Sequence, residues 1–260
     1  MKKILFVIAI AAVIAGPALA QTAADHIQEG DAAYAAFDDT KALENYQAAL
    51  ALEPGNYEAL WKTSRAMVDI ADVIPGTGKD VKERQKEMYT EATSLARKAV
   101  AANPDDTWGH FQLAAANGKR LLLLGKKEQI AASKAVRDSI EKAIELDPTN
   151  HLAYHAYGRW HRRMDEIGGA KRLFGSILYG SIPKGSFAES ETYLRKAIEL
   201  HPEYINHYLE LGRTLVALKR YDEAAESFQN VIDMPKTTSK DDVLKAEAKA
   251  ELEALKTKKK

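Results

Sequence analysis

The stretch YLELGRTLVALKRYDEAAESFQNVIDMP, residues 208–235, carries the strongest structural signal in this chain of 260 residues. Its first half places large apolar side chains three and four residues apart around Gly212, and its second half repeats that spacing from Ala224 to Val231. This spacing gathers the apolar side chains on one face of a helix. Pro235 cannot continue a helix and therefore ends the second one. The stretch predicts two amphipathic helices joined by a short turn.

Four earlier segments repeat the second half of this pattern, each as an alanine-rich helix that ends at a proline. They are ALENYQAALALEPGN (42–56), SLARKAVAANPDD (94–106), SIEKAIELDPTN (139–150) and YLRKAIELHPEY (193–204). The last unit, with Leu211, Gly212 and Leu215 in its first helix and Ala224 and Phe228 in its second, matches the tetratricopeptide-repeat motif. A single unit cannot bury its apolar face, so units must stack. We predict an all-α tetratricopeptide-repeat solenoid of about five helix pairs.

A small residue is expected where the two helices of each unit cross. Gly30, Ser64, Ala114, Gly158 and Gly212 occupy this place in the five units. A small residue lets the paired helices approach closely, and larger side chains fill the space around it. Packing therefore explains these positions without any chemistry.

Two insertions break the repeat. The first, DVIPGTGKDVKERQK at 72–86, lies between the helices of the second unit. The second, IGGAKRLFGSILYGSIPKGSF at 167–187, lies between the helices of the fourth unit. Its apolar residues are spaced as in a short amphipathic helix, and connections longer than necessary often carry function.

A further helix is predicted after the last unit, over residues 239–256, where it caps the open end of the solenoid. Ser239 and Asp242 are suited to cap its N-terminus. Its inward-facing residues are expected to be Val243, Leu252 and Leu255. Residues 257–260 are predicted to be a basic, solvated tail.

The first twenty residues, MKKILFVIAIAAVIAGPALA, have the layout of a secretory signal peptide: Lys2 and Lys3, an apolar run, and Ala18-Leu19-Ala20 before a polar residue. Cleavage leaves residues 21–256 as the repeat domain, with no integral membrane span. We therefore expect an exported protein, located in the periplasm or alternatively secreted.

Composition excludes several classes of function. Lys+Arg and Asp+Glu both number 37, and removing Lys2 and Lys3 leaves 35 against 37, so the mature chain is nearly neutral. General nucleic-acid binding needs a basic surface that neutralises phosphates, so no nucleic-acid partner is expected. The chain has no cysteine, which excludes disulfides, thiolate metal sites and cysteine catalysis.

Three partial motifs fall short of an active site. PGTGKD at 75–80 resembles part of a phosphate-binding loop, but Val73 replaces the first glycine and Asp80 replaces the magnesium-binding Ser or Thr. His151 and His155 lie one helical turn apart, yet no third metal ligand accompanies them. The serines near glycines lack the context of a nucleophile elbow. We predict no catalytic residue, no cofactor and no metal.

Longer motifs carry a more specific resemblance. They are Trp108 in DDTWGHFQLA (105–114), IAASKAVRDSIEKAIELDP (130–148), YHAYGRWHRRMDEI (154–167), KRLFGSILYGSIPKGSFAESETYLRKAIELHP (171–202), and YLELGRTL with MPKTTSKDDVLKAEAKAEL towards the end. In this order they resemble the regulator of microtubule dynamics family and its bacterial relatives, over residues 25–255. The resemblance implies an all-helical scaffold without catalytic residues that binds partners. For some eukaryotic relatives, the resemblance also implies a role in contacts between two membranes, and it implies a lipid ligand.

The first helices of the units are expected to line a concave groove that is aromatic in its first half and basic in its second. The candidate ligand-binding residues are Trp61, Arg65, Trp108, Phe111, Lys119, His155, Arg159, Arg162 and Arg213. Converging cations suit a carboxylate, a phosphate or an acidic peptide. Alternatively, the arginines pair with local acids such as Asp165 and Glu166 as ordinary surface salt bridges.

Two hypotheses of function follow. The first is a non-enzymatic, exported scaffold whose groove binds an acidic peptide or protein partner, with the aromatic residues as anchors. The second is a protein that binds a lipid or another anionic small molecule, with the 167–187 insertion as a lid or membrane contact. The candidate lid residues are Leu173, Phe174, Ile177 and Leu178.

Overall fold

The computed structural model describes residues 21–169, 172, 175, 177 and 182–258. Within these residues the chain forms eleven α-helices and no strand. The helices are α1 (Ala23–Ala35), α2 (Asp39–Leu52), α3 (Tyr57–Asp72), α4 (Lys79–Ala102), α5 (Thr107–Leu122), α6 (Lys126–Leu146), α7 (His151–Asp165), α9 (Phe187–Leu200), α10 (Ile205–Ala217), α11 (Tyr221–Asp233) and α12 (Asp241–Lys258). The predicted all-α solenoid is confirmed, with α1–α2, α3–α4, α5–α6, α7–α9 and α10–α11 as the five pairs.

Short polar side chains begin the helices by accepting a hydrogen bond from a free backbone amide of the first turn. The capping residues of α2, α3, α5, α7 and α9 are Asp38, Asn56, Asp106, Asn150 and Ser186. Asp38 and Asp106 are therefore helix caps. Helix capping accounts for the carboxylates at the N-termini of these helices without a catalytic role.

In three of the pairs the small residue is a glycine that lies against a large side chain of the partner helix, as predicted. Ser64 is fully buried, and its hydroxyl donates to the carbonyl oxygen of Ala92 at 2.8 Å. A Cβ atom added at the glycines would lie 2.4 Å from Tyr46 Cε1 at Gly30, 2.6 Å from Leu194 Cγ at Gly158 and 2.5 Å from Phe228 Cε1 at Gly212. The three pairs with a glycine therefore have no room at that place for one more methyl group.

The two insertions differ in structure. Residues 73–78 connect α3 to α4, whereas residues 79–86 are helical and lengthen α4 to 24 residues. The predicted connection over 72–86 is thus wrong for its second half, because long charged side chains favour a helix once the glycines have passed. The second insertion joins α7 to α9 as predicted, although Leu173, Phe174 and Leu178 of the candidate lid lie outside the described residues.

A segment that we call the strap, residues 236–240, runs from the last helix pair to the first two pairs. Ser239 Oγ donates to Asp39 of α2, and Lys240 Nζ lies 2.6 Å from Asp69 Oδ1 of α3. Ser239 therefore does not cap α12, which corrects the prediction. The carboxylate of Asp241, the first residue of α12, accepts hydrogen bonds from the backbone amides of residues 237 and 238 and so fixes the strap to the start of this helix.

The capping helix α12 packs on α11 and α10. Leu255 is buried and Leu252 is partly buried, as predicted, whereas Val243 is 43 % exposed and faces the mouth of a pocket. Ala248 takes the inward place instead, because it is fully buried. The helix continues to Lys258, two residues past the predicted end of the domain.

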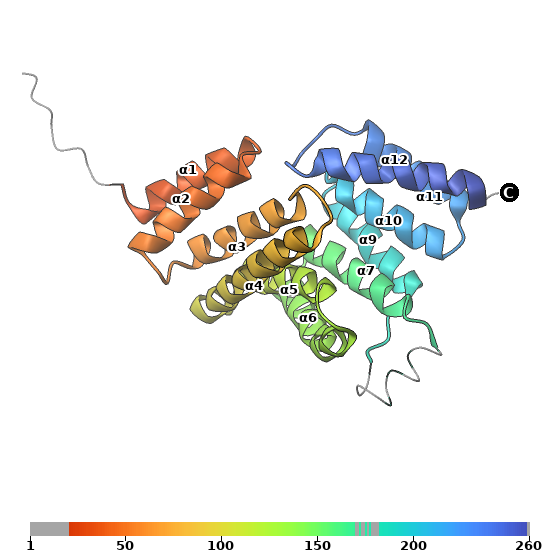
Figure 1. The fold of residues 1–260 in the computed structure, drawn as a ribbon, viewed down its shortest axis with the longest axis horizontal. Coiled ribbons are helices and arrows are strands. Elements are labelled where there is room, and N and C mark those ends of the chain that lie inside the picture. Colours follow the sequence, from red (N-terminus) through yellow and green to blue (C-terminus); the bar gives the residue numbers. More distant parts are fainter. Residues whose placement is uncertain (1–20, 170–171, 173–174, 176, 178–181, 259–260) are drawn as a thin grey trace, which may run out of the picture.

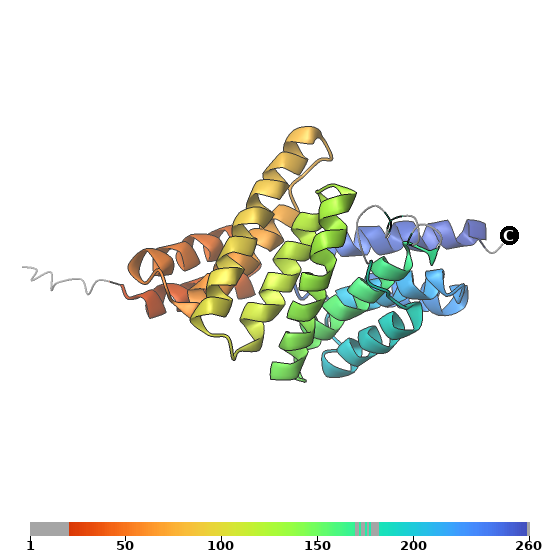
Figure 2. The same cartoon turned by 90° about the horizontal axis from the view of Figure 1, so that it is seen from below.

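The helix pairs follow one another along an arch (Figure 1), and the long α4 projects from one side of it (Figure 2). In Figure 1 the strap and α12 lie across from the ends of α1 and α3. The two ends of the arch are thus joined by the contacts of the strap. Among the helices that the structure describes, none is both long and apolar enough to cross a membrane.

The contact between Gly212 and Phe228 can be tested with Gly212→Ala. An alanine here forces the Phe228 ring to move, so we expect a loss of about 1–3 kcal/mol in the free energy of unfolding, measured by urea denaturation. Gly118→Ala is the matched control, because no atom lies within 4 Å of the added Cβ in α5. There the higher helix propensity of alanine should add about 0.5–1 kcal/mol. Equal effects of the two substitutions would contradict the close packing.

Candidate functional site

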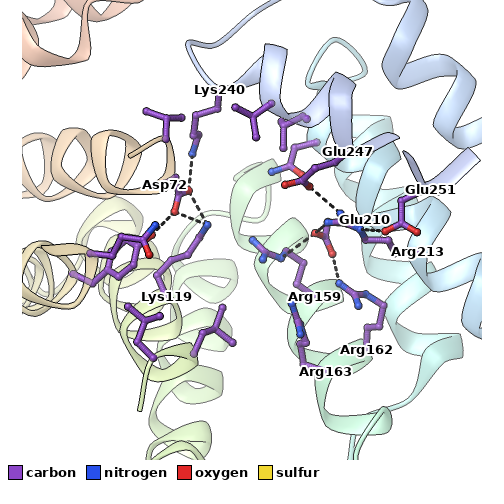
Figure 3. Close-up of a pocket in the computed structure, with 18 of the residues that line it drawn as sticks. Asp72, Lys119, Arg159, Arg162, Arg163, Glu210, Arg213, Lys240, Glu247 and Glu251 are labelled. Atoms are coloured by element: carbon purple, nitrogen blue, oxygen red, sulfur yellow. Dashed lines mark hydrogen bonds and ion pairs between the residues drawn. The ribbon is translucent and has the colours of Figure 1, made fainter. Parts of the chain in front are cut away.

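An open pocket of about 690 Å³ occupies the hollow of the arch, between α3 and α5 on one side and α7, α10 and α12 on the other (Figure 3). Its lining is mostly charged. The cations are Lys119, Arg159, Arg162, Arg163, Arg213 and Lys240, and the carboxylates are Asp72, Glu166, Glu210, Glu247 and Glu251. The curvature of the solenoid has therefore brought together charges from residues 72 to 251 of the sequence.

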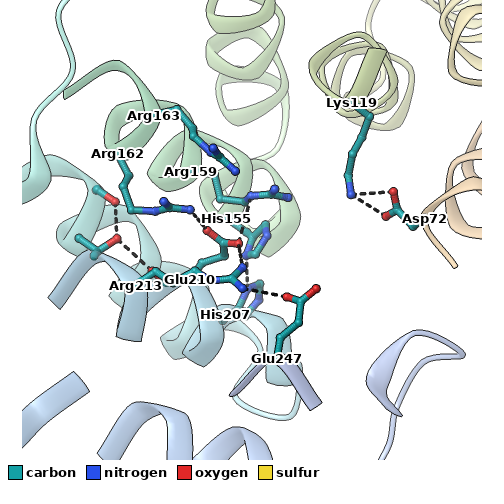
Figure 4. A network of polar contacts seen from close by, with 12 residues as sticks. Asp72, Lys119, His155, Arg159, Arg162, Arg163, His207, Glu210, Arg213 and Glu247 are labelled. Atoms are coloured by element: carbon teal, nitrogen blue, oxygen red, sulfur yellow. Dashed lines mark hydrogen bonds and ion pairs between the residues drawn. The ribbon is translucent and has the colours of Figure 1, made fainter. Parts of the chain in front are cut away.

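Glu210 of α10 lies at the centre of the larger ionic network (Figure 4). Its carboxylate is buried and pairs with Arg162 Nη2, with Arg213 Nη1 at 3.1 Å and with Arg159 Nε at 3.5 Å. Burial raises the pKa of Glu210, but the three arginines outweigh burial and hold this pKa well below its usual range. Glu210 is therefore charged in the folded protein and holds α7 against α10.

A smaller network on the opposite wall joins Asp72, Lys119 and the strap (Figure 3). Lys119 Nζ donates to both oxygens of Asp72 at 2.7 Å, the Tyr89 hydroxyl donates to Oδ1 at 2.7 Å, and Lys240 Nζ lies 3.4 Å from Oδ2. Although burial raises the pKa of Asp72, Lys119 and Lys240 lower it to about 2. Lys240, held by Asp69 and Asp72 despite its burial, has a pKa well above its usual value.

Two arginines at the floor of the pocket retain free donors. Arg159 makes one ion pair, from Nε to Glu210, and its two terminal nitrogens have no partner among the described residues. The side chain of Arg163 is half exposed. Its Nη1 lies 4.0 Å from Oε2 of Glu166, which is its one ion-pair partner within the described chain. Burial and the positive charges of Arg162 and Arg159 lower the pKa of Arg163. This crowding of like charges favours an anion between Arg159 and Arg163.

The predicted aromatic residues form a separate row on α3 and α5. The rings of Trp61 and Trp108 stack with centroids 5.2 Å apart, and Phe111 meets Trp108 edge-on at 6.1 Å. The guanidinium of Arg65 covers the ring of Tyr34 at 3.7 Å and that of Trp61 at 5.0 Å. None of these residues is part of the pocket lining. The single aromatic and basic groove of the prediction is therefore divided into an aromatic row and a charged pocket.

His155 does not line the pocket either, because it is buried between α7 and α10. Its Nδ1 lies 3.0 Å from Nδ1 of the fully buried His207, whose Nε2 lies 2.9 Å from Nδ1 of His151. His207 turns a different ring nitrogen to each neighbour, so the three imidazoles form a hydrogen-bonded chain and do not surround a common point. In the part of the chain that the structure describes, no group of three or more His, Asp or Glu side chains is arranged so that it could hold a metal ion.

Of the nine predicted groove residues, Lys119, Arg159, Arg162 and Arg213 line the pocket. Sequence reasoning missed the counterions Glu210 and Asp72 and the strap residue Lys240. Glu210 had a detectable signal, since it is an acid two residues before the small residue of a buried helix crossing. The alternative of local pairing is also partly right, because Arg162 pairs with Glu166 as well as with Glu210.

The candidate lid remains a prediction. Ile177 is 75 % exposed, and no described residue of the 167–187 insertion lines the pocket. Arg172 nevertheless ties the described part of this insertion to α7, because it donates to the backbone carbonyl oxygen of Met164 at 2.5 Å.

The buried network around Glu210 can be tested with Glu210→Gln. The substitution keeps the shape of the side chain but leaves three converging arginines without their central charge, so we expect a loss of about 3–5 kcal/mol in the free energy of unfolding. Glu247→Gln is the matched control, because Glu247 also pairs with Arg213 but is 44 % exposed, and an exposed pair contributes about 0–1 kcal/mol. Equal losses in urea denaturation would show that burial does not strengthen the Glu210 network.

The histidine chain predicts a loss of stability in mild acid. Burial lowers the pKa of His151 to about 4 and that of His155 to about 3, and burial with the neighbouring imidazoles also lowers the pKa of His207. Below pH about 6.5 these three histidines bind protons in the unfolded chain but stay neutral in the folded protein. Stability should therefore fall as the pH drops from about 6.5 to 4.

His155→Gln removes one of these groups while keeping a hydrogen-bonding side chain. Between pH 6 and pH 5 the variant should lose up to about 1 kcal/mol less stability than the unmodified protein, as one proton fewer is taken up on unfolding. Urea denaturation across this range gives the measurement. Parallel pH profiles would show that His155 is protonated equally in the folded and unfolded chains.

Comparison with known proteins agrees with the resemblance. The family model of regulator of microtubule dynamics protein 1-3 matches residues 26–256. Regulator of microtubule dynamics protein 1 of Bos taurus is 28 % identical over 197 residues, which cover 75 % of this chain and 61 % of that protein. The Caenorhabditis elegans protein of the same name is 24 % identical over 196 residues, covering 75 % and 84 %. The matched part of the chain spans about three fifths of the length of the bovine and mouse forms of protein 1 and about half that of the mouse form of protein 2.

Solved structures show the same fold at low sequence identity. A thermophilic TPR protein of Thermus thermophilus superposes with a TM-score of 0.61 at 16 % identity, covering 89 % of this chain and 99 % of that one. PilF of Pseudomonas aeruginosa superposes with a TM-score of 0.52 at 13 % identity, covering 90 % and 91 %. The tetratricopeptide-repeat fold is thus shared, and since the family model spans nearly all of the described residues, the chain belongs to the regulator of microtubule dynamics family.

Proposed function

We propose that this chain is a non-enzymatic binding scaffold that holds an acidic segment of a partner protein in the charged pocket. The observation that carries the proposal is the pair Arg159 and Arg163, which line the pocket and each make one long ion pair, at 3.5 Å and 4.0 Å, with a described residue. A guanidinium offers a fork of donors that matches a carboxylate, and two forks side by side suit two acidic groups on one peptide. The other cations of the lining are already paired with Glu210 or Asp72.

The rim of the pocket supports a peptide with both acidic and apolar residues. Leu122 at the end of α5 is 49 % exposed, Val243 at the start of α12 is 43 % exposed, and both belong to the lining. An extended segment could therefore place its carboxylates on the arginines at the floor and its apolar side chains against the rim. Such a division of charged and apolar contacts is typical of peptide sites on repeat scaffolds.

We further propose that the scaffold acts after export. The support is the leader-like sequence of residues 1–20, with its two lysines, apolar run and small residues before Gln21. The lipid hypothesis has no comparable support, because no described residue of the candidate lid lies at the pocket.

The proposal predicts that Arg159→Ala combined with Arg163→Ala weakens the binding of an acidic peptide. With labelled hexaglutamate as the probe and residues 21–260 as the protein, fluorescence anisotropy should show a Kd at least about tenfold higher, because two charge-assisted contacts are lost. The dependence of Kd on salt should also become less steep, because fewer ionic contacts remain.

Arg84→Ala combined with Arg97→Ala is the matched control. Both arginines are exposed on α4, do not line the pocket, and their loss changes the net charge by the same amount. The control should bind the probe as the unmodified protein does. If both double variants weaken binding equally, the probe responds to overall charge and the pocket is not its site.

A further inference from the structure

We infer that the strap is an autoinhibitory clamp: Lys240 holds the two ends of the arch together, and its release joins the charged pocket to the aromatic row as one longer groove. This inference concerns the regulation of the pocket and rests on the proposed function for its binding consequence. It begins from the ionic contacts of Lys240, which lies in the sequence 168 residues or more after both of its partners.

The contacts of the strap bridge parts of the arch that otherwise do not meet. Lys240 contacts Asp69 and Asp72 of α3, and Ser239 contacts Asp39 of α2, whereas none of the helices α10, α11 and α12 packs extensively on α1 to α4. The continuous connection between the two halves runs through the packing of α7 on α5 and α6. That packing is the natural hinge, and the strap is a fastening on the opposite side of the pocket.

Lys240 lies where the aromatic row meets the pocket. Trp61, Arg65 and Asp69 follow one another at intervals of four residues and so share one face of α3. Asp69 binds Lys240 from this face, while Asp72, the other partner of Lys240, belongs to the pocket lining (Figure 3). Trp61 itself is buried, whereas Trp108 is partly exposed, and an extended ligand that reached from the arginines to Trp108 would have to pass the strap.

The clamp is well built for a reversible fastening. Its ion pair is largely shielded from water, with side-chain exposures of 18 % for Lys240 and 8 % for Asp69. Releasing it leaves neither carboxylate isolated, because Asp69 keeps the Tyr34 hydroxyl at 3.0 Å and Asp72 keeps Lys119 and Tyr89. An acidic ligand also offers new carboxylates to Lys240 and Lys119, so it binds the open form in preference and shifts the population towards it.

The test uses Lys240→Met, which removes the ammonium group and keeps the aliphatic stem. Because the chain has no cysteine, Glu44→Cys on α2 and Gln229→Cys on α11, both exposed, give two unique labelling sites for spin labels. Pulsed electron paramagnetic resonance should show a longer distance between the two spin labels in Lys240→Met than in the labelled protein without this substitution. Lys236→Met is the matched control, since Lys236 is in the same strap but pairs only with the exposed Asp242 among described residues. Its separation should not change.

Binding gives the second measurement. Hexaglutamate should associate with Lys240→Met about tenfold faster than with the unmodified protein. Without the Lys240 ion pair, a larger fraction of the protein is already in the open form that binds the probe. Loss of one positive charge alone would slow the association of an anion, so an acceleration cannot come from electrostatic steering. If Lys240→Met fails to fold, Asp69→Asn with Lys240→Met removes both charges of the pair and should give the same two results.

The outcomes separate the two proposals. Label separations that coincide in Lys240→Met, Lys236→Met and the unmodified protein overturn the clamp, whatever the probe does. A longer separation in Lys240→Met without hexaglutamate binding by any of the proteins supports the clamp and overturns the acidic-peptide function.

Discussion

The close approach of two helices at a small residue is the constraint on which the arrangement of this chain depends. At Gly30, Gly158 and Gly212 a single added carbon atom would collide with Tyr46, Leu194 or Phe228. Each helix pair is therefore a rigid unit whose shape is set by that contact. The units stack with a constant sense of rotation, and the resulting curvature decides which side chains meet in the hollow of the arch.

Much of the fold was readable from sequence because its periodic features are local. The spacing of apolar residues around Gly212 and the proline that closes each unit define helices within about 34 residues of chain. The first insertion was misjudged beyond Lys79 because a charged helix and a charged loop have similar compositions. Residues 79–86 are helical because extending the existing helix α4 avoids the cost of starting a new one.

The site was predictable only in part, for a geometric reason. Arg159, Arg162, Arg213 and Lys119 could be assigned to the concave face because each follows from its place on a first helix. Several of their counterions come from other units or from α12, and the positions of these counterions depend on the summed rotation of several helix pairs. In place of the predicted basic patch, the pocket holds two ionic networks of both signs, in which Arg159 and Arg163 are the least tightly paired arginines. Burying such networks favours a defined geometry more than it favours stability.

The contact between Ser239 and Asp39 spans 200 residues of sequence and has a consequence for folding. In an open array each repeat is stabilised only by its neighbours, so the end units fray first and unfolding spreads inward in stages. Here the strap, which leads into the last helix, is bound to α2 and α3 as well, so the first two pairs and the strap hold one another in place. Loss of the first two pairs then releases the strap, so the strap and these pairs should exchange their amide hydrogens together, as one cooperative unit of the folded chain.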